Sequence, residues 1–378
     1  MLRICITFDY ELWLDRIIPA EQKHLFAATK QLSDMLTAEH TAGTFFADTC
    51  SVQVHAAQWD TDYCRRFTAQ LQNLARNGQD VQLHLHPSWH KCRFDGHDWQ
   101  MSYDGYKVHD YGFDPSAELS AVTIIRDGVR YLEETLKPVD PDYRCVAYRA
   151  GGFCIRPEEE LTRALRETGI LVDSSVALGQ KAIGDHQDYD FTDVSDRCSW
   201  WFDAGAKLTE ETGKSEHSLY EVAIGYGRNS LIKFTGIRPA DLRVRYYPRI
   251  VADASESLNA SSTSGHKPLS VGNEPSVSRG VRYRRLLYGV SRRLWGKGIL
   301  SFDTRGYRVL LRDMEENYRR YHCDREDHEI AILCHPKMAS QDTVENMRSF
   351  IREIRKREDR FSFCTMRDVA EQRMGLNA

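Results

Sequence analysis

The first 170 residues alternate between short apolar runs and longer segments whose apolar residues recur three and four positions apart. The short runs have the length and composition of buried strands, and they are Arg3–Phe8, Gly43–Ala47, Asp80–Leu85, Arg144–Tyr148 and Ile170–Asp173. The longer segments have the periodicity of helices that bury one face, at about 21–38, 63–77, 115–136 and 157–168. A repeated strand, helix, strand order requires parallel strands with crossover helices, so the sequence predicts an α/β protein.

The alternation weakens after Asp173 and returns towards the end of the chain. The aromatic, polar stretch that follows Asp173 is typical of long loops. We then expect strands near Ser218–Ile224 and Ile330–Cys334, helices near 306–321 and 341–356, a strand at 361–365 and a short last helix.

One region does not follow this pattern. Residues 252–278 contain eight serines and few aliphatic residues, so they cannot bury enough apolar area to offset chain entropy, and we expect a disordered insertion. The next residues carry seven basic side chains and no acidic one, which predicts a basic amphipathic helix at 281–295. This helix either docks against the rest of the domain or lies reversibly on an anionic membrane. We therefore predict one domain, 1–250 and 299–378, interrupted at 251–298.

Composition limits the class of protein. A chain of 378 residues with 41% hydrophobic residues can fill one large core, and its net charge of −4 gives no general attraction for nucleic acid. No segment is long and apolar enough to span a membrane, and the first residues lack a secretory signal, so we expect a cytoplasmic protein. The ten cysteines stand singly without a CxxC pair, which favours reduced core thiols over disulfides.

Carboxylates and imidazoles follow two of the predicted strands. Asp9 and Glu11 stand two apart at the end of the first, and side chains two apart in an extended chain project from the same face. His84 and His86 have the same spacing at the end of another strand, with His90 four residues further on. Because parallel strands bring their carboxyl ends to one rim, these groups can meet there and bind a metal ion. The alternatives are solvated or ion-paired acids and structural histidines.

Two further motifs stand at strand ends. Arg149 follows an apolar run and precedes Gly151 and Gly152, which allow a tight turn or a close approach to a ligand. His335 ends a buried strand at Pro336, and a histidine placed there can act as a general acid.

Taken in order, six motifs resemble those of the polysaccharide deacetylase family, the NodB-type esterases of carbohydrate esterase family 4: TFDYE, TFF (Thr44–Phe46), HLHPSWH, YRAGGF, VDSS (Val172–Ser175) and ILCHPK. The resemblance runs from residue 1 to about 370. It implies a distorted (β/α)7 or (β/α)8 barrel of the NodB type, with the insertion between its two parts. It also implies that Asp9 is the catalytic base, Arg149 its partner and His335 the acid.

The metal ligands follow a variant of the family pattern. In the common form a metal-binding aspartate directly follows the base, but Tyr10 stands there, and a variant form places the ligand one residue later. The common second motif has its second histidine four residues after the first, where this chain has Ser88. The resemblance thus implies these ligands for a divalent ion, usually zinc: Glu11, His84 and His86, with His90 as the substitute.

The activity implied is hydrolysis of an N-acetyl or other N-acyl group on an amino sugar or glycan precursor. We expect Trp89, Tyr148 and Gly151 to contact the substrate. Two alternatives remain open. The departures at Tyr10 and Ser88 suggest a carbohydrate-binding barrel with weak or no activity, and related barrels hydrolyse C–N bonds of compounds that are not sugars.

Overall fold

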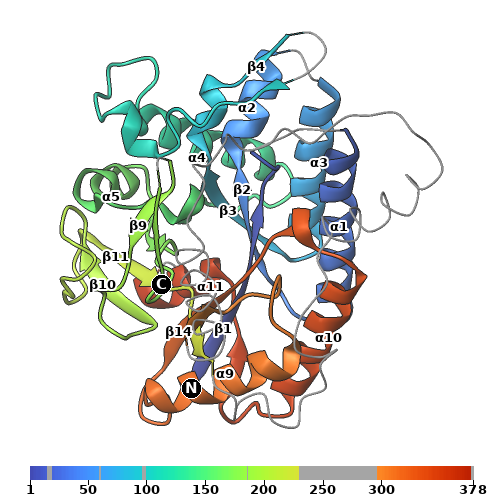
Figure 1. The fold of residues 1–378 in the computed structure, drawn as a ribbon, viewed down its shortest axis with the longest axis vertical. Coiled ribbons are helices and arrows are strands. Elements are labelled where there is room, and N and C mark those ends of the chain that lie inside the picture. The colour runs from blue at the N-terminus through green and yellow to red at the C-terminus, as the bar shows by residue number, and fades with distance from the viewer. Residues whose placement is uncertain (15–18, 59–60, 96–98, 185, 230–295, 376–378) are drawn as a thin grey trace, which may run out of the picture.

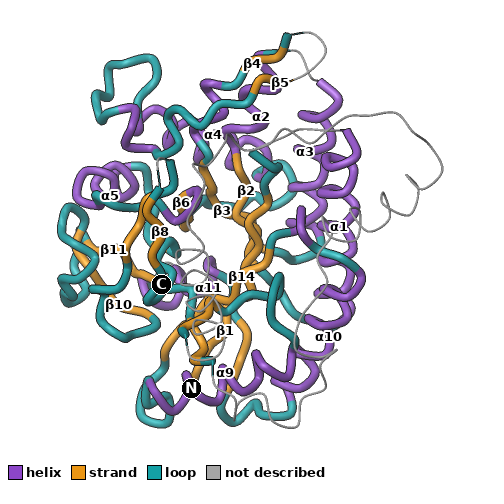
Figure 2. The backbone as a smooth tube through the Cα atoms, viewed as in Figure 1, coloured by secondary structure: helices purple, strands orange, loops and turns teal. Residues whose placement is uncertain are grey.

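A computed structural model of the chain describes residues 1–14, 19–58, 61–95, 99–184, 186–229 and 296–375. Its centre is a curled sheet in which neighbouring strands pair in parallel, except for one antiparallel edge strand (Figures 1 and 2). In spatial order the strands are β10 (Ser199–Asp203), β11 (Ser218–Val222), β7 (Val172–Asp173), β6 (Ala147–Ala150), β3 (Asp80–Leu85), β2 (Thr44–Asp48), β1 (Leu2–Tyr10) and β14 (His328–Cys334), with β15 (Phe361–Phe363) also paired to β1.

Helices surround this sheet, and three of them, α1, α3 and α10, lie side by side along one flank (Figure 1). The described helices are α1 (Pro19–Ala38), α2 (Thr49–Ala57), α3 (Thr61–Arg76), α4 (Ala121–Leu136), α5 (Glu158–Glu167), α9 (Tyr307–Arg320), α10 (Gln341–Arg355) and α11 (Met366–Met374). Short 3-10 turns are η1 (Pro87–Lys91), η2 (Val108–Tyr111), η3 (Gly151–Phe153) and η5 (Pro336–Met338). Small hairpins are formed by β4 (Arg93–Phe94) with β5 (Trp99–Gln100), β8 (Lys181–Ile183) with β9 (Asp188–Asp190), and β12 (Tyr226–Arg228) with β13 (Lys297–Ile299).

The two ends of the sheet meet at Ala331 on β14. Its N–H donates to the carbonyl of Ala223 at 3.0 Å, and its carbonyl accepts from the N–H of Gly225 at 3.2 Å. Beyond these bonds, Leu300 and Phe302 pair with Leu333 through backbone bonds of 3.0 and 2.8 Å. The sheet therefore curls into an irregular barrel whose closure depends on few bonds, and the predicted distorted NodB-type barrel is confirmed.

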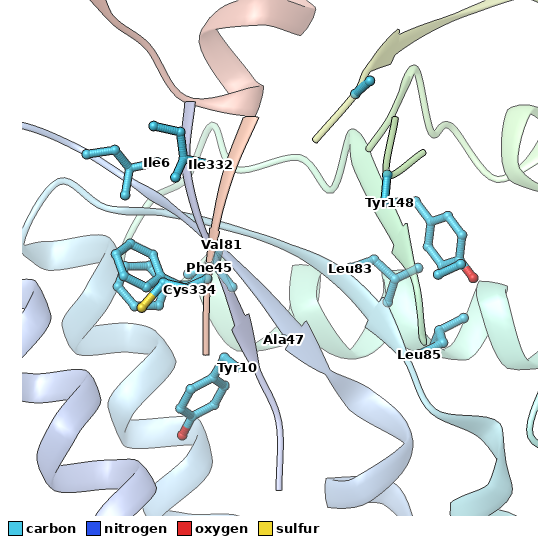
Figure 3. Close-up of a cluster of buried hydrophobic side chains, with 14 of the residues drawn as sticks. Ile6, Tyr10, Phe45, Ala47, Val81, Leu83, Leu85, Tyr148, Ile332 and Cys334 are labelled. Atoms are coloured by element: carbon cyan, nitrogen blue, oxygen red, sulfur yellow. The ribbon is translucent and has the colours of Figure 1, made fainter. Parts of the chain in front are cut away.

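Side chains on each strand alternate between the helix layer and the barrel interior, as the pleat requires. On β1 the side chains of Ile6, Phe8 and Tyr10 belong to the larger apolar cluster, which also contains Phe45 and Leu83 (Figure 3). A second apolar cluster holds the alternate residues of the strands, among them Cys5, Phe46, Ala147, Ala331 and Leu333. The first cluster joins the sheet to its helices, and the second fills part of the interior. All ten cysteines are free, and nine of them are buried.

Most predicted elements coincide with observed ones within a few residues. Helix α4 begins at Ala121 and not at 115, because the Ser120 side chain accepts a hydrogen bond from the N–H of Thr123 and caps the helix there. The loops expected after Asp173 are interrupted by β8, β9 and β10, so that part of the prediction is wrong. These strands are only three to five residues long, and such short runs carry little periodicity.

The predicted serine-rich insertion and basic helix, residues 252–278 and 281–295, lie outside the described residues. Among the helices that are described, none combines the length and apolar composition that a membrane span requires.

Asp173 on β7 and Glu221 on β11 are direct neighbours in the parallel ladder, and both side chains are fully buried. The Glu221 carboxyl accepts the N–H of Val176 at 3.2 Å, and Asp173 accepts the hydroxyl of Ser175 at 2.7 Å. Burial and the adjacent Asp173 raise the pKa of Glu221 well above its usual value. The folded state therefore favours a protonated Glu221.

We predict that Glu221→Gln stabilises the protein at pH 8 but not at pH 4. A carboxyl whose pKa is raised by folding contributes its full stability below its unfolded pKa and loses it as pH rises, and glutamine does not titrate. The expected gain at pH 8 is on the order of 1 kcal/mol or more, a rise in Tm of roughly 1 °C or more for a chain of 378 residues. Thermal unfolding of both proteins at the two pH values measures it. Equal differences at both would contradict the assigned protonation.

Candidate active site

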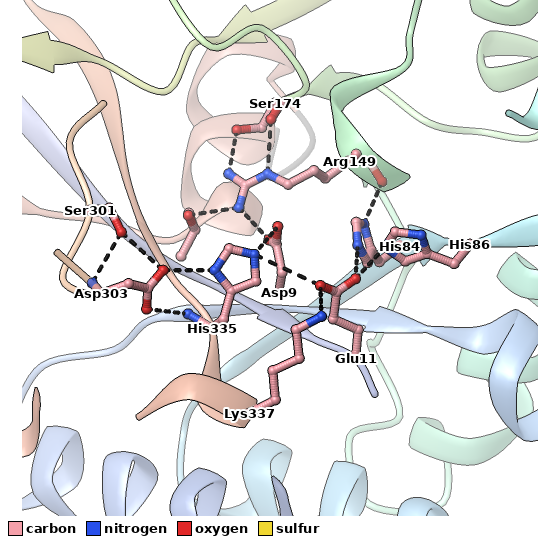
Figure 4. A network of polar contacts seen from close by, with 12 residues as sticks. Asp9, Glu11, His84, His86, Arg149, Ser174, Ser301, Asp303, His335 and Lys337 are labelled. Carbon is pink, nitrogen blue, oxygen red and sulfur yellow. Dashed lines mark hydrogen bonds and ion pairs between the residues drawn. The ribbon is translucent and has the colours of Figure 1, made fainter. Parts of the chain in front are cut away.

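The polar groups of the predicted site meet inside one rim of the barrel (Figure 4). Asp9 and His84 are the penultimate residues of β1 and β3, Arg149 lies on β6 and His335 follows β14. Side chains along β1 point alternately to the barrel interior and to the helices, and this alternation determines which of them lie in the site. Asp9 and Glu11 share the interior face, whereas the Tyr10 ring packs 5.1 Å from Phe67 on the helix side. The tyrosine at the family's usual ligand position thus faces away from the site, and the carboxylate two residues after Asp9 faces into it.

Glu11, His84 and His86 form a buried group whose potential ligand atoms all lie within 4.8 Å of one another. His84 Nε2 is 3.0 Å from Glu11 Oε2, and His86 Nε2 lies close to the same oxygen. His84 Nδ1 contacts the carbonyl of Arg149 at 2.7 Å, so Nδ1 carries a hydrogen, and Nε2 is the nitrogen that faces Glu11 and could bind a metal. Within the described residues, neither ring nitrogen of His86 has a hydrogen-bond partner of good geometry. A divalent ion would give His86 Nε2 the partner that it lacks, so the donor set fits a metal such as zinc.

Gly151 allows His86 to occupy this place. A Cβ atom at Gly151 would lie 2.8 Å from His86 Nδ1 and 2.3 Å from the carbonyl oxygen of Leu85. The backbone N–H of His86 also donates to Asp48 Oδ1 at 3.0 Å. Gly151, expected to contact substrate, therefore has a steric role next to a candidate ligand.

Asp9 is held by Arg149, which is fully buried. Arg149 Nη1 donates to Asp9 Oδ1 at 2.7 Å and to Thr7 Oγ1 at 2.9 Å, and its other nitrogens donate to the carbonyl and hydroxyl of Ser174 at 2.9 and 2.8 Å. Burial opposes ionisation of Asp9, but Arg149, helped by His84 and His335, keeps the Asp9 pKa below its usual value. Asp9 is thus an ionised carboxylate outside the Glu11, His84 and His86 group.

His335 approaches the same place from the other side. Its Nε2 lies 3.7 Å from Asp9 Oδ2 and 3.8 Å from Glu11 Oε1, while its Nδ1 contacts Asp303 Oδ2 at 2.7 Å. The backbone N–H of His335 donates to the second oxygen of Asp303 at 2.9 Å. Burial opposes protonation of the ring, but Asp303 raises the pKa of His335 above its usual value. The geometry therefore directs Nε2 into the site, and the contact with Asp303 favours the protonated form of the ring.

Three predicted residues lie elsewhere. Trp89 and Tyr148 are fully buried, with the Trp89 ring 5.8 Å from that of Trp99, so neither has exposed surface for a substrate. Tyr148 directly precedes the inward-facing Arg149 and so faces the helices, which corrects its expected contact with substrate. His90 is not among the candidate ligand atoms, and burial lowers its pKa to about 4.

Three residues at the site were missed by sequence reasoning: Asp48, Asp303 and Lys337. Asp48 directly ends β2, so its position at a strand's carboxyl end was a usable signal. Lys337 stands two residues after His335, but nothing local indicates that its amine turns towards Glu11. Asp303 follows a short run that pairs with β14 at an isolated bridge, Ser301 to Leu333, and not along a regular strand, so it had no clear strand signal.

An open groove of about 390 Å³ adjoins the site between the loop before η2 and the β8–β9 hairpin. Tyr106 connects the two, because its ring lies 5.9 Å from that of His86 and it also lines the groove. The exposed rings of Tyr103 and His186 stack in the groove, with centroids 5.1 Å apart. Aromatic faces and polar edges are thus available beside the candidate metal ligands.

No protein-family model matches the sequence, and no curated protein is similar enough to count as a match. Solved structures similar to this chain include the Mycobacterium smegmatis protein named a polysaccharide deacetylase (13% identity, TM-score 0.46, 98% of this chain and 89% of that one). A Pseudomonas aeruginosa protein with the same name is also similar (11% identity, TM-score 0.42, 98% of this chain and 89% of that one). So is Puue allantoinase (12% identity, TM-score 0.42, 98% of this chain and 88% of that one). At these low identities the similarity concerns the fold alone. The function must therefore be argued from the site.

We predict that His86→Ala and Glu11→Gln each lose divalent-metal affinity, whereas His90→Ala does not. Loss of an outer partner of a metal ligand already costs about 10–100-fold in affinity, so loss of the ligand itself should cost at least as much. The measurement is zinc content after dialysis against a chelator series, with circular dichroism to confirm folding. Normal zinc binding by His86→Ala together with its loss in His90→Ala would show that the ligand set is wrong.

Proposed function

We propose that this protein is a metal-dependent hydrolase that removes the N-acetyl or another N-acyl group from an amino sugar. The observation that carries the proposal is the placement of Asp9 and His335. One ionised carboxylate and one protonated imidazole flank the Glu11, His84 and His86 group without belonging to it. A hydrolase of amides needs a base for water and an acid for the leaving amine, in positions that can act on one carbonyl.

Glu11, His84 and His86 would hold a divalent ion, which would supply Lewis acidity for the amide carbonyl and lower the pKa of water. Asp9 accepts a proton from the attacking water, and Arg149 keeps Asp9 ionised and fixes its orientation through the 2.7 Å bond. Because Arg149 is also bound to Thr7 and Ser174, the base cannot turn away from the site. The arrangement therefore preorganises the first proton transfer.

His335 supplies the second proton transfer. The Asp303 carboxylate accepts the Nδ1 hydrogen, which leaves Nε2 directed towards Asp9 and Glu11. His335 donates its Nε2 proton to the nitrogen of the departing amine as the C–N bond breaks. Asp303 acts as a positioning residue, since it contacts the acid and not the reacting atoms.

The groove favours a carbohydrate substrate. Tyr103, Tyr106 and His186 offer ring faces on which the apolar face of a sugar can stack, and Gln187 lies among them. The groove is open to solvent, so a substrate longer than one sugar can extend into it.

The direct test is acetate release from N-acetylglucosamine and its β-linked oligomers by protein loaded with zinc or cobalt. The proposal expects acetate from at least one substrate and none after removal of metal with a chelator. Absence of acetate from the whole series, with metal bound, would contradict it. Amide hydrolysis of allantoin in parallel would identify a substrate that is not a sugar.

We predict that Asp9→Asn lowers kcat by about 10²–10⁴, the usual contribution of a general base, while zinc binding persists. The amide keeps the shape of the carboxylate but accepts no proton from water. Steady-state kinetics and zinc analysis of the same preparation test both parts. If zinc is lost and added zinc restores activity, Asp9 is a ligand and not the base.

We predict that Tyr103→Ala and His186→Ala raise KM for oligomers by roughly 2- to 12-fold each, since one aromatic contact contributes about 0.5–1.5 kcal/mol. The KM of the monomer and kcat should change little, because neither ring lies in the Glu11, His84 and His86 group. Phe94→Ala is the matched control, since Phe94 is exposed to the same degree as Tyr103, 37% against 38%, and does not line the groove. Equal effects on monomer and oligomer would contradict a saccharide subsite here.

A further inference from the structure

Lys337 places a buried ammonium group against the carboxylate of the candidate metal site. Its Nζ donates to Glu11 Oε1 at 2.6 Å and to the carbonyl of Leu12 at 3.2 Å, and it lies 4.8 Å from the centroid of the Trp13 ring. The residue as a whole is 8% exposed. These contacts hold the charge in one place, on the η5 turn directly after His335.

The two oxygens of Glu11 have different partners (Figure 4). Oε1 contacts Lys337, whereas Oε2 faces the Nε2 atoms of His84 and His86. Lys337 therefore leaves one oxygen of Glu11 to act as a ligand and neutralises the carboxylate before any cation binds. The other charged groups nearby have partners of their own, since Arg149 is bound to Asp9 and His335 to Asp303.

We propose that Lys337 is the internal counter-ion of Glu11 and that it lowers the affinity of the Glu11, His84 and His86 site for divalent ions. The proposal rests on the assignment of these three residues as ligands. Burying the Glu11 carboxylate without a cation is costly, and Lys337 removes this cost in the metal-free protein. A divalent ion then gains less from neutralising Glu11 and is also repelled by the ammonium group. Lys337 is thus a positioning residue that sets how tightly the metal is held.

The test compares Lys337→Met, which keeps an unbranched side chain one atom shorter but removes the charge, with Lys337→Arg, which keeps the charge. Zinc affinity is measured by competition with a chromophoric chelator, and Tm is measured in chelator and in excess zinc. Lys181→Met is the matched control, because it removes a lysine charge from the exposed ion pair with Asp190, away from the site.

We expect Lys337→Met to bind zinc at least tenfold more tightly than the wild type. Its Tm should be lower in chelator, and its rise in Tm on adding zinc should be larger. Lys337→Arg and Lys181→Met should have wild-type zinc affinity. Should Lys337→Met not fold in chelator, Lys337→Gln removes the charge while keeping a hydrogen-bond donor, and the same increase in affinity is expected.

Unchanged or weaker zinc binding by both uncharged variants would overturn the proposal, since a merely structural lysine cannot make binding tighter when it is lost. Zinc binding by the variants but not by the wild type would support the counter-ion role and would contradict metal-dependent hydrolysis by the natural chain. If none of the proteins binds zinc, both the ligand assignment and the role of Lys337 are wrong. Tighter binding without any hydrolysis would leave the role of Lys337 intact and count against the proposed activity alone.

Discussion

Three buried carboxylates at the rim of the barrel, Asp9, Glu11 and Asp303, each have a cation as their partner. Arg149 is paired with Asp9, Lys337 with Glu11, and His335 with Asp303. Charges removed from water are tolerated when they are paired and hydrogen-bonded, so three acids can occupy one interior site only with three such partners. The pairing also orients the acids, since each partner comes from a strand end or turn fixed by the surrounding fold. The cation that each carboxylate contacts underlies its proposed role: Asp9 is the base, Glu11 is a metal ligand, and Asp303 positions the acid His335.

The curled parallel sheet brings these pairs together. Strands β1, β3, β6 and β14 direct alternate side chains inward, and their carboxyl ends share one rim. The opposite face of the same strands packs against helices, which fixes the strands and leaves no freedom for a polar residue to change sides. A one-residue slip of β1 would move Tyr10 into the site and both Asp9 and Glu11 out of it. Chemistry and core packing are thus set by the same register.

Much of the site was predictable from local sequence, because spacing within a strand determines which residues share a face. The spacing of two between Asp9 and Glu11, and between His84 and His86, was sufficient to place four groups on the interior face. The same alternation places Tyr148, the neighbour of the inward-facing Arg149, on the helix side. The prediction that Tyr148 contacts substrate used only the aromatic character of this residue. Trp89 shows the same limit, since aromatic type does not reveal burial.

The remaining contacts depend on residues that the sequence does not bring together. Asp303 lies more than thirty positions before His335, and the bridge of Ser301 to Leu333 on β14 brings the two residues together. The direction of the Lys337 amine depends on its contact with Glu11, which follows β1 and lies 326 positions earlier in the sequence. Such contacts require the closed barrel, and no periodicity or motif in the chain encodes them locally.

The central claim is that Glu11, His84 and His86 bind a metal ion beside an independent base and acid. A crystal structure of the zinc-loaded protein, with data collected at the zinc absorption edge, tests it most directly. The account predicts one anomalous peak about 2.0–2.1 Å from the Nε2 atoms of His84 and His86, bound also by Glu11, with Asp9 outside the ligand set. A peak elsewhere in the molecule, or none while Lys337 remains paired with Glu11, would contradict it.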